Sequence, residues 1–286
     1  MEEKSLYAVI GYPIAHSLSP QMQNAGFSAC RIPAEYTAIE VAPENVGVFA
    51  EEAREKLAGF NITVPHKSAI IHFLDEADPL AAKQESVNTV VIRNGKLAGY
   101  STDGYGLEEA LKEAFSFTLP SQSVTFIGCG GVVKALAMHF AQAGVKKIHL
   151  LNRTVSKAEA LANTLQEFFP SLALETAPID DREKIKNFLE ESALAVQCTS
   201  CGLKKEDPAP IPPELLPSHI LLYDTIYKNT PLLQYAKSRN IPCAGGLSML
   251  LHQGAKSFSL WTGKEAPLEA MRKALYEAAE ERGVLT

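Results

Sequence analysis

Two charged residues follow predicted strands in the first third of the chain, where their side chains could move a proton. Lys67 ends the stretch "NITVPHK", whose β-branched residues and proline indicate an extended segment, and Asp103 follows another extended stretch in "YSTDG". In an α/β fold, polar residues at the carboxyl ends of strands face the ligand crevice. An amine and a carboxylate placed there could exchange a proton with a hydroxyl group. Most lysines are simply solvated, so a functional role for Lys67 requires other polar residues beside it.

Further hydroxyl and amide side chains occur at the ends of neighbouring predicted elements. In "GYPIAHSLSP", Ser17 and Ser19 precede a predicted helix, where hydroxyls and free backbone amides would suit a small carboxylate. Ser19, which a proline follows, would also cap that helix in the absence of any ligand. Thr63, Asn88 and Thr89 stand at predicted strand ends. Together, these donors and acceptors suit a polyhydroxylated acid.

A glycine-rich loop lies between a predicted strand and a predicted helix in "TFIGCGGVVKAL". Gly128, Gly130 and Gly131 would let the backbone turn tightly and approach a pyrophosphate at the helix start. The third glycine of the usual pattern is replaced by Val133. The strand–loop–helix context still predicts a dinucleotide site. The alternative is a glycine turn needed only for packing.

The residues after the next predicted strand indicate which dinucleotide would bind. An NAD site usually carries Asp or Glu at this strand end. The sequence instead has Asn152, Arg153 and Thr154, with Lys157 one turn later. A guanidinium and a hydroxyl suit a 2′-phosphate, which a carboxylate would repel. The pattern therefore favours NADP, the alternative being an arginine that is merely solvated.

The hydrophobic pattern predicts strands and helices in alternation, which is typical of α/β folds. In the first hundred residues we expect strands over 5–13, 34–41 and 59–65, helices over 19–32, 44–57 and 66–77, and a hairpin over 86–103 turned by Asn94-Gly95. Further on we expect strands over 123–131, 146–154, 172–179, 193–200 and 219–227, and helices over 106–115, 132–144, 155–169, 248–263 and 267–283.

Composition excludes several classes of protein. A length of 286 residues suggests two domains, and a net charge of −6 without a basic stripe argues against nucleic acid as a partner. No apolar run approaches the ~20 residues of a membrane span, and the N-terminus does not resemble a signal peptide. An odd number of cysteines, five, predicts no disulfide framework and suggests a reducing cytoplasm. We interpret Cys198 and Cys201, a lone C-x-x-C, as loop residues rather than a metal or redox site.

Taken together, these motifs resemble the shikimate dehydrogenase family nearly from end to end. The matching stretches are "GYPIAHSLSP", "NITVPHK", "SVNTVV", "STDGYG", "GCGGVVKAL", "NRTVSKAEALA", "CTSCGL", "TPLL" and "GGLSMLLHQGAKSF". The resemblance implies an α/β fold with an N-terminal substrate domain on a mostly parallel sheet and a Rossmann-like NADP-binding domain. It places the substrate domain at 1–103, completed by C-terminal helices at 248–286, and the cofactor domain at 104–247.

The resemblance also implies a role for each matching residue. Lys67 and Asp103 would form the catalytic pair. The other residues around the substrate would be Ser17 and Ser19 for its carboxylate, Thr63, Asn88, Asp103 and Gln253 for its hydroxyls, and Tyr227 near its ring. The residues around the cofactor would be Gly128, Gly130, Gly131, Asn152, Arg153, Thr154, Lys157, Thr199, Gly246 and Met249.

Three features depart from the family pattern. Gln23 stands where the family commonly has His, and Ser101 replaces the usual Asn beside the catalytic Asp. The stretch "YKNTPLL" at Tyr227 is shorter than the family's usual stretch, so we expect its loop to adopt a different position. The Gly245-Gly246 pair is a candidate hinge for domain closure.

The activity implied by the resemblance is reversible, NADPH-dependent reduction of 3-dehydroshikimate to shikimate, in the shikimate pathway of aromatic amino acid biosynthesis. The closest alternative is a quinate/shikimate dehydrogenase of broader specificity. A catalytically silent, ligand-sensing paralogue would be expected to lack the Lys/Asp pair, which is present. An acidic start at Met1 gives no support to a module of a larger bifunctional enzyme.

We expect a small-molecule substrate, no metal, and neither nucleic acid nor membrane as a partner. A homodimer is one assembly that the sequence allows.

Overall fold

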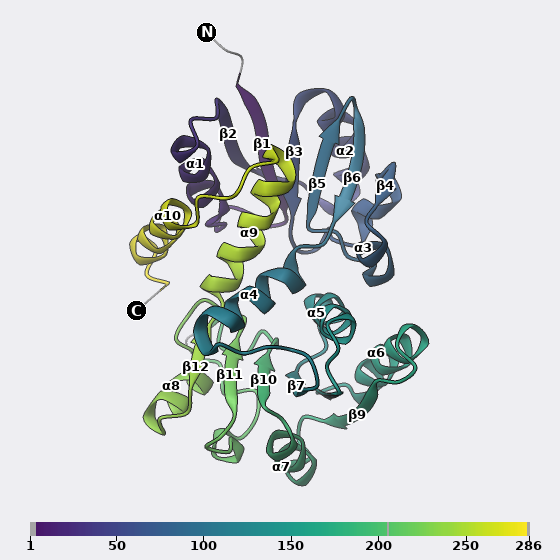
Figure 1. Cartoon of the computed structure of the whole chain (residues 1–286), viewed down its shortest axis with the longest axis vertical. Coiled ribbons are helices and arrows are strands. Elements are labelled where there is room, and N and C mark those ends of the chain that lie inside the picture. Colours follow the sequence, from purple (N-terminus) through teal and green to yellow (C-terminus); the bar gives the residue numbers. More distant parts are fainter. Residues whose placement is uncertain (1–3, 205, 285–286) are drawn as a thin grey trace. The chain divides into compact units, whose positions relative to one another are not determined.

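The structure, a computed structural model, describes residues 4–204 and 206–284 and contains two compact units. The first unit is formed by residues up to Gly106 together with Leu250–Arg282, and the second by Leu107–Met249. Each unit is built around a six-stranded β-sheet, labelled in Figure 1. The two-unit α/β architecture agrees with the fold class predicted from the sequence.

The sheet of the first unit is mixed. Its strands follow the order β2-β1-β3-β5-β6-β4. Their bounds are β1 Ser5–Gly11, β2 Ala34–Glu40, β3 Gly59–Ile62, β4 Glu76–Ala77, β5 Thr89–Arg93 and β6 Lys96–Tyr100. β1 runs parallel to both β2 and β3, whereas β5 is antiparallel to β3 and β6. Because β5 runs against β3, the start of β5 lies beside the end of β3.

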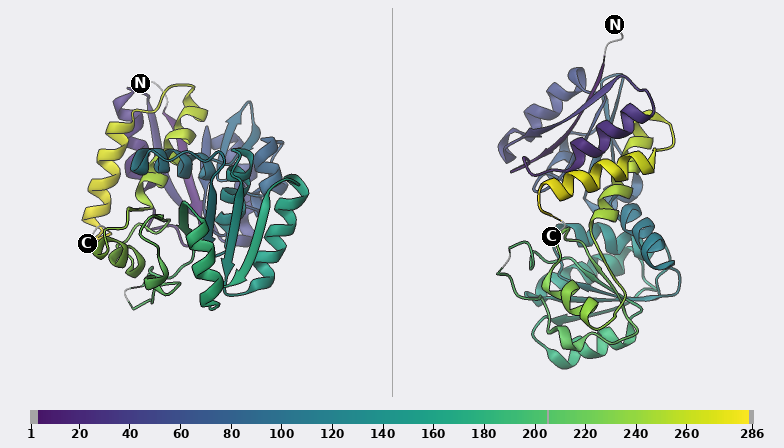
Figure 2. Two further views of the ribbon diagram at one scale, coloured as in Figure 1. Left: turned by 60° about the horizontal axis from the view of Figure 1, so that its bottom comes forward. Right: turned by 90° about the vertical axis from the view of Figure 1, so that its left-hand side faces the viewer.

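Helices cover both faces of this sheet (Figures 1 and 2). The helices and 3-10 turns of this unit are α1 Ser19–Ala29, η1 Pro43–Asn45, α2 Val46–Lys56, η2 Ala69–Phe73, α3 Pro79–Gln84 and α10 Leu268–Glu281. The first residues of α4, Asp103–Gly106, and the part of α9 from Leu250 to Thr262 also belong to it. Alternate side chains of β1 point to opposite faces. Ala8 and Ile10 join a core cluster with α2, whereas Tyr7 stacks on Phe27 of α1 and contacts Trp261 of α9.

The sheet of the second unit is parallel throughout, in the order β12-β11-β10-β7-β8-β9. The strand bounds are β7 Ser123–Ile127, β8 Lys147–Asn152, β9 Ala173–Pro178, β10 Leu194–Gln197, β11 Leu221–Asp224 and β12 Cys243–Gly245. The order reverses between β7 and β10, as it does in the doubly wound dinucleotide-binding fold. Loops that leave the carboxyl ends of these two strands therefore flank the usual ligand crevice of such sheets.

The helices of the second unit also pack on both faces of its sheet. The bounds are α4 Asp103–Phe115, of which residues from Leu107 on belong to this unit, α5 Gly131–Gln142, α6 Val155–Phe168, α7 Arg182–Glu191, η3 Pro213–Leu215 and α8 Pro231–Ser238. Of α9 Leu247–Thr262, only the residues up to Met249 belong to this unit. On one face, Ile185 and Phe188 of α7 join Leu232 of α8 in a buried cluster with the strands. On the other face, Phe126 of β7 contacts Phe140 of α5. In the described part of the chain, no helix has both the length and the apolar character needed to cross a membrane.

Several local predictions were wrong in detail. The segment 66–77, predicted as one helix, is a 3-10 turn followed by the short strand β4, because Asp75 turns back to the sheet by donating its N–H to the Leu97 carbonyl. Ser19 is the first helical residue of α1 rather than its cap. Asn88 and Thr89 stand at the start of β5, not at a carboxyl strand end. The elements α3, α7, α8, β4 and β12 were not predicted.

Candidate active site

Lys67 and Asp103 form an ion pair in the first unit. The Lys67 Nζ lies 2.6 Å from Oδ2 of Asp103. The Asp103 side chain is 6% exposed and the Lys67 side chain is 21% exposed, so the pair is largely screened from solvent while the ammonium stays accessible. Removal from water strengthens the attraction between the two charges. A fixed ammonium next to a fixed carboxylate can both orient a hydroxyl group and exchange its proton.

The loop after β3 fixes the backbone that carries Lys67. The Val87 N–H donates to the Lys67 carbonyl over 2.9 Å, and the His66 N–H donates to the Thr63 carbonyl over 3.0 Å. His66 is buried, and its Nε2 lies 2.6 Å from the Val41 carbonyl oxygen. Three segments therefore hold this turn in one conformation, from which the Lys67 side chain reaches Asp103.

Asn88 connects Asp103 to the rest of the site. Its amide nitrogen donates to Oδ1 of Asp103 over 2.9 Å, so each carboxylate oxygen of Asp103 has its own donor. The Asn88 Oδ1 accepts from the Thr102 N–H over 2.8 Å, which fixes the entry to α4. The same amide nitrogen lies 3.2 Å from Oε1 of Gln253 in α9. The structure thus brings together Lys67, Asn88, Asp103 and Gln253.

A second row of buried polar residues supports this group, and apart from Thr89 its members were not singled out from the sequence. The Asn61 amide nitrogen lies 3.0 Å from both the Thr89 hydroxyl and the Ser257 hydroxyl. The Tyr36 hydroxyl donates to Asn61 Oδ1 over 2.7 Å. Ser257 follows Gln253 by one helical turn, so that spacing in α9 was the available signal. A buried network with satisfied partners rigidifies the site that it supports.

The predicted carboxylate-binding serines lie together at the start of α1. The Ser19 N–H points at the Ser17 hydroxyl over 3.3 Å. The Arg282 guanidinium at the end of α10 donates to the Ser17 carbonyl over 3.2 Å. The loop that carries the serines contacts the lysine loop, because the Tyr12 N–H donates to the Val64 carbonyl over 3.1 Å. Between these loops, the Thr63 side chain packs against Gly11.

In the second unit, the glycine loop has the geometry expected of a phosphate site. Gly128 has a φ of +97°, and a Cβ at this position would clash with Thr199. Gly130 caps α5, and Gly131 is its first residue; both are exposed. Exposed backbone amides at the start of a twelve-residue helix offer hydrogen bonds and a positive dipole end to a pyrophosphate. The observed loop therefore fits the predicted dinucleotide, and buried Val133 replaces the third glycine without closing the loop.

The residues after β8 form the neighbouring part of this site. The Asn152 Oδ1 accepts from the Cys129 N–H over 3.0 Å, which ties the glycine loop to the end of β8. Arg153, Thr154 and Lys157 are exposed at the start of α6. Two cationic side chains and a hydroxyl at a helix N-terminus form a favourable surface for a phosphate monoester.

Of the remaining predicted residues, Thr199 follows β10, Tyr227 follows β11 and Gly246 follows β12, whereas Met249 lies in the first turn of α9. The Thr199 N–H donates to the Gln197 side chain, and the Thr199 hydroxyl accepts from the Cys201 N–H. Gly246 is required because a Cβ there would clash with the Thr225 carbonyl, and it lies against the half-exposed ring of Tyr227.

Two residues that sequence reasoning missed organise these loops. The Tyr223 hydroxyl accepts from the Met249 N–H over 3.0 Å and thereby caps α9. The Asp224 carboxylate accepts from the Thr230 hydroxyl over 2.7 Å and from the Ile226 N–H over 2.9 Å. Burial raises the pKa of Asp224 to about 6. The shortened loop after Tyr227 is thus closed by a buried aspartate at the end of β11.

The cysteines near the glycine loop are free thiols. Burial raises the pKa of Cys129 to about 12, and burial together with the nearby Asp224 charge raises that of Cys198. Both groups are therefore protonated near neutral pH, a state that suits neither metal binding nor thiolate chemistry.

Comparison with known families then identifies the group of proteins to which the chain is related. Residues 9–90 match the shikimate dehydrogenase substrate-binding domain, residues 109–201 match shikimate/quinate 5-dehydrogenase, and residues 246–276 match the shikimate 5′-dehydrogenase C-terminal domain. The chain belongs to the shikimate dehydrogenase family. The family predicted from the motifs is therefore confirmed.

Individual relatives within this family match over nearly their whole length. A shikimate dehydrogenase (NADP(+)) of Thermococcus kodakarensis is 40% identical, over 98% of this chain and 98% of the relative. A shikimate 5-dehydrogenase of Listeria monocytogenes, in complex with shikimate and NAD, is 32% identical with a TM-score of 0.90, over 96% and 97% of the two chains. A Thermus thermophilus enzyme, in complex with NADP(H) and shikimate, is 32% identical with a TM-score of 0.85, over 96% and 99%.

Proposed function

We propose that this protein is an NADP-dependent shikimate dehydrogenase, which catalyses the reversible reduction of 3-dehydroshikimate to shikimate. The observation that carries the proposal is the buried arrangement in which Asp103 accepts from Lys67 on one oxygen and from Asn88 on the other. Family membership supplies the substrate class, and the named activity of the relatives is the same.

The proton transfer is assigned to the Lys67–Asp103 pair. Reducing a ketone requires a proton for the forming alkoxide, and the reverse reaction requires a base for the hydroxyl proton. The Lys67 ammonium carries three donors, of which one is directed at Asp103. A second can therefore hydrogen-bond the reacting oxygen and deliver its proton, while Asp103 keeps the amine in place. NADP, when bound, supplies or accepts the hydride.

The other residues of the first unit are assigned to substrate binding. Ser17 and Ser19 offer hydroxyls beside the start of α1, which suits a carboxylate. Asn88 and Gln253, joined to each other over 3.2 Å, offer amide groups that can both donate to and accept from sugar-like hydroxyls. Thr63, on the loop that also carries Lys67, is assigned to the same substrate hydroxyls. Tyr227 is assigned to the edge of the substrate ring, from the second unit.

The second unit is assigned to NADP. The pyrophosphate is placed on the exposed amides of Gly130 and Gly131, and the 2′-phosphate on Arg153, Thr154 and Lys157, with Asn152 between the two. Thr199 after β10, Gly246 after β12 and Met249 in the first turn of α9 are assigned to the nicotinamide half. The substrate role thus falls to residues 1–103 with 248–286, and the cofactor role to residues 104–247. These limits lie within three residues of the divisions at Gly106 and Met249. Free cysteines support a reducing cytoplasm as the location.

The main alternative is a dehydrogenase that also oxidises quinate, because the matching family model covers both substrates. Initial rates of formation of NADPH from NADP and of NADH from NAD, each with shikimate and with quinate, separate the two. The proposal predicts the highest kcat/KM for shikimate with NADP. If kcat/KM for quinate equals that for shikimate, the protein is instead a dehydrogenase of broader specificity. Absence of turnover with either substrate would favour a silent, ligand-binding paralogue.

A further inference from the structure

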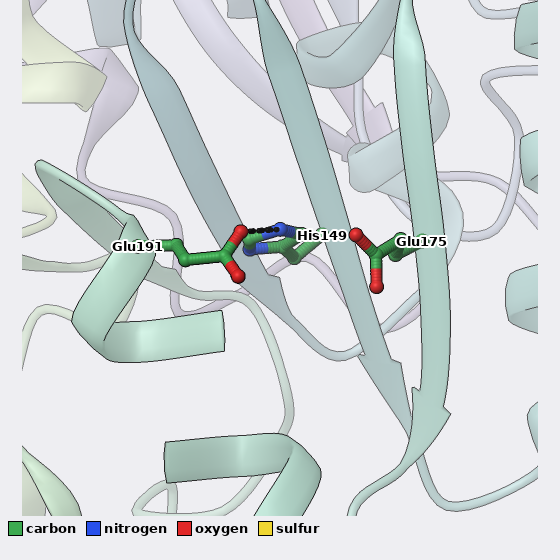
Figure 3. Close-up of side chains that lie close together, drawn as sticks. All are labelled: His149, Glu175 and Glu191. Atoms are coloured by element: carbon green, nitrogen blue, oxygen red, sulfur yellow. Dashed lines mark ion pairs between the residues drawn. The ribbon is translucent and has the colours of Figure 1, made fainter. Parts of the chain in front are cut away.

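Three side chains from separate elements of the second unit meet near the amino-terminal edge of its sheet. His149 lies on β8, Glu175 on β9 and Glu191 at the end of α7 (Figure 3). One nitrogen of the histidine and one oxygen of each glutamate all lie within 4.8 Å of one another. His149 and Glu175 are direct neighbours in the register of β8 and β9. The cluster is therefore built on two paired strands rather than on a mobile loop.

The buried histidine points an unused nitrogen at this cluster. His149 is 0% exposed and stacks on Phe188, with ring centroids 4.3 Å apart. Its Nδ1 lies 3.2 Å from the Phe188 carbonyl oxygen, 3.3 Å from the Thr125 hydroxyl and 3.4 Å from the Ser192 hydroxyl. Because the carbonyl can only accept, the ring proton is assigned to Nδ1. Nε2 then carries a lone pair, and among the described residues it has no hydrogen-bond partner. Histidines that bind metals typically donate their other ring N–H to a backbone carbonyl in this way.

The charged groups around Nε2 favour the binding of a cation. The closest atom of the cluster is Oε2 of Glu191 at 3.5 Å, so the lone pair faces a carboxylate. Burial, together with the Lys147 ammonium, lowers the pKa of His149. The Lys147 ammonium lies 2.5 Å from Glu175 and 2.7 Å from Glu191 and balances one of their two charges. The charges of Lys147, Glu175 and Glu191 therefore add up to −1.

The surroundings allow the lysine to be replaced. A hollow of about 540 Å³ borders the cluster and is lined by Ser123, Lys146, Lys147, Ala173, Leu174, Glu175 and Glu191. The two carboxylates are 44% and 54% exposed, so an ion from solvent can reach them. The Lys147 side chain is long and can turn into this space, leaving an imidazole and two carboxylates as ligands.

We propose that His149, Glu175 and Glu191 form a binding site for a divalent transition metal ion of the Zn²⁺ class, which displaces the Lys147 ammonium. One imidazole nitrogen and two carboxylates, with a water molecule, are a donor set that Zn²⁺ accepts. The ion links β8, β9 and the end of α7, so its expected effect is to stabilise the second unit. The site lies toward the strand starts, at the sheet edge opposite the glycine loop, and is independent of the proposed reaction.

The test is titration of the metal-free, full-length protein with Co²⁺ and Zn²⁺. Co²⁺ is followed by its visible absorption and Zn²⁺ by calorimetry and by the midpoint of thermal unfolding. We expect one equivalent of Co²⁺ without the intense near-ultraviolet band of thiolate ligands, which distinguishes this site from binding at Cys198 and Cys201. We also expect Zn²⁺ to raise the unfolding midpoint.

Two sets of variants distinguish the effect of losing the metal ligands from the effect of losing the ion pairs with Lys147. Glu175→Gln and Glu191→Gln change exposed side chains and should weaken binding about tenfold or more, since even outer partners of metal ligands have effects of this size. Lys147→Met breaks the same ion pairs but keeps all three ligands, and it should bind Zn²⁺ more tightly than the wild type. Equal affinity in the wild type and the Glu175→Gln/Glu191→Gln double variant would overturn the proposal. So would a thiolate band as the only Co²⁺ signal, or absence of binding by Lys147→Met.

Discussion

The Lys67 ammonium and the Asp103 carboxylate lie 2.6 Å apart, and the second oxygen of that carboxylate accepts from Asn88 over 2.9 Å. Asp103 is therefore held from two sides, whereas among the described residues the Lys67 ammonium has one recorded partner, Asp103. From this asymmetry we propose that the lysine moves the proton and that the aspartate orients it.

Replacing Lys67 should remove catalysis more than binding. Lys67→Ala is expected to lower kcat by about 10²–10⁴-fold, the range typical of a lost general acid or base, with a modest change in the KM for shikimate. Steady-state kinetics in both directions measure the effect. Lys56→Ala, which breaks an exposed pair with Glu52, serves as the control and should behave as the wild type. A Lys67→Ala enzyme with wild-type turnover would contradict the assigned role.

Replacing Asn88 should affect the fold as well as the reaction. Asn88 is 2% exposed and bonds to Thr102, Asp103 and Gln253. In Asn88→Ala the Thr102 N–H loses its side-chain acceptor, and leaving a buried group unpaired costs about 1–3 kcal/mol. Urea unfolding should show a loss of this size, together with a lower kcat. An unchanged unfolding midpoint would mean that water or another group replaces the amide.

Replacing Arg153 should weaken the binding of NADP and leave the binding of shikimate unchanged. Charge-assisted hydrogen bonds contribute about 1.5–3 kcal/mol, so Arg153→Ala should raise the KM for NADP by about ten- to a hundredfold. The KM for shikimate and any turnover with NAD should stay nearly constant, because NAD has no 2′-phosphate. Arg182→Ala, which breaks an exposed pair with Glu214, is the control. An equal loss of activity with NAD and NADP would assign Arg153 to the part that both cofactors share.

The buried Asp224 should make stability depend on pH. Its folded-state pKa of about 6 lies above the ~3.9 of an unfolded aspartate. Its contribution to stability is therefore fully present below about pH 4 and is lost as the pH rises through about 6. For Asp224→Asn, the difference in unfolding free energy from the wild type should shift in favour of the variant by about 2 kcal/mol between pH 4 and pH 7. A pH-independent difference would mean that Asp224 titrates at its ordinary pKa.

The sequence was most informative where local chemistry decides the structure. Asn94 and Gly95 predict a tight turn because both adopt positive φ, and both do so here at +52° and +72°. The glycine loop was likewise predicted from Gly128, whose backbone conformation few other residues tolerate. Family membership followed from several such motifs in order.

The parts that could not be predicted depend on contacts between distant segments. Asn88 was placed at a strand end, but its position at the start of β5 follows from antiparallel pairing with β3, which periodicity does not reveal. The partnership of Asn61 with Ser257 joins residues 196 positions apart. The role of Tyr223 as a cap of α9 and the approach of Glu191 to His149 likewise arise only after the chain has folded.

The most direct test of the central claim is the absorbance of NADPH after the purified protein is mixed with shikimate and NADP, with Lys67→Ala measured beside it. The proposed function predicts steady formation of NADPH by the wild-type protein and its consumption when 3-dehydroshikimate is supplied, with both rates reduced by orders of magnitude in Lys67→Ala. Tight binding of shikimate by the wild-type protein without any formation of NADPH would contradict the claim.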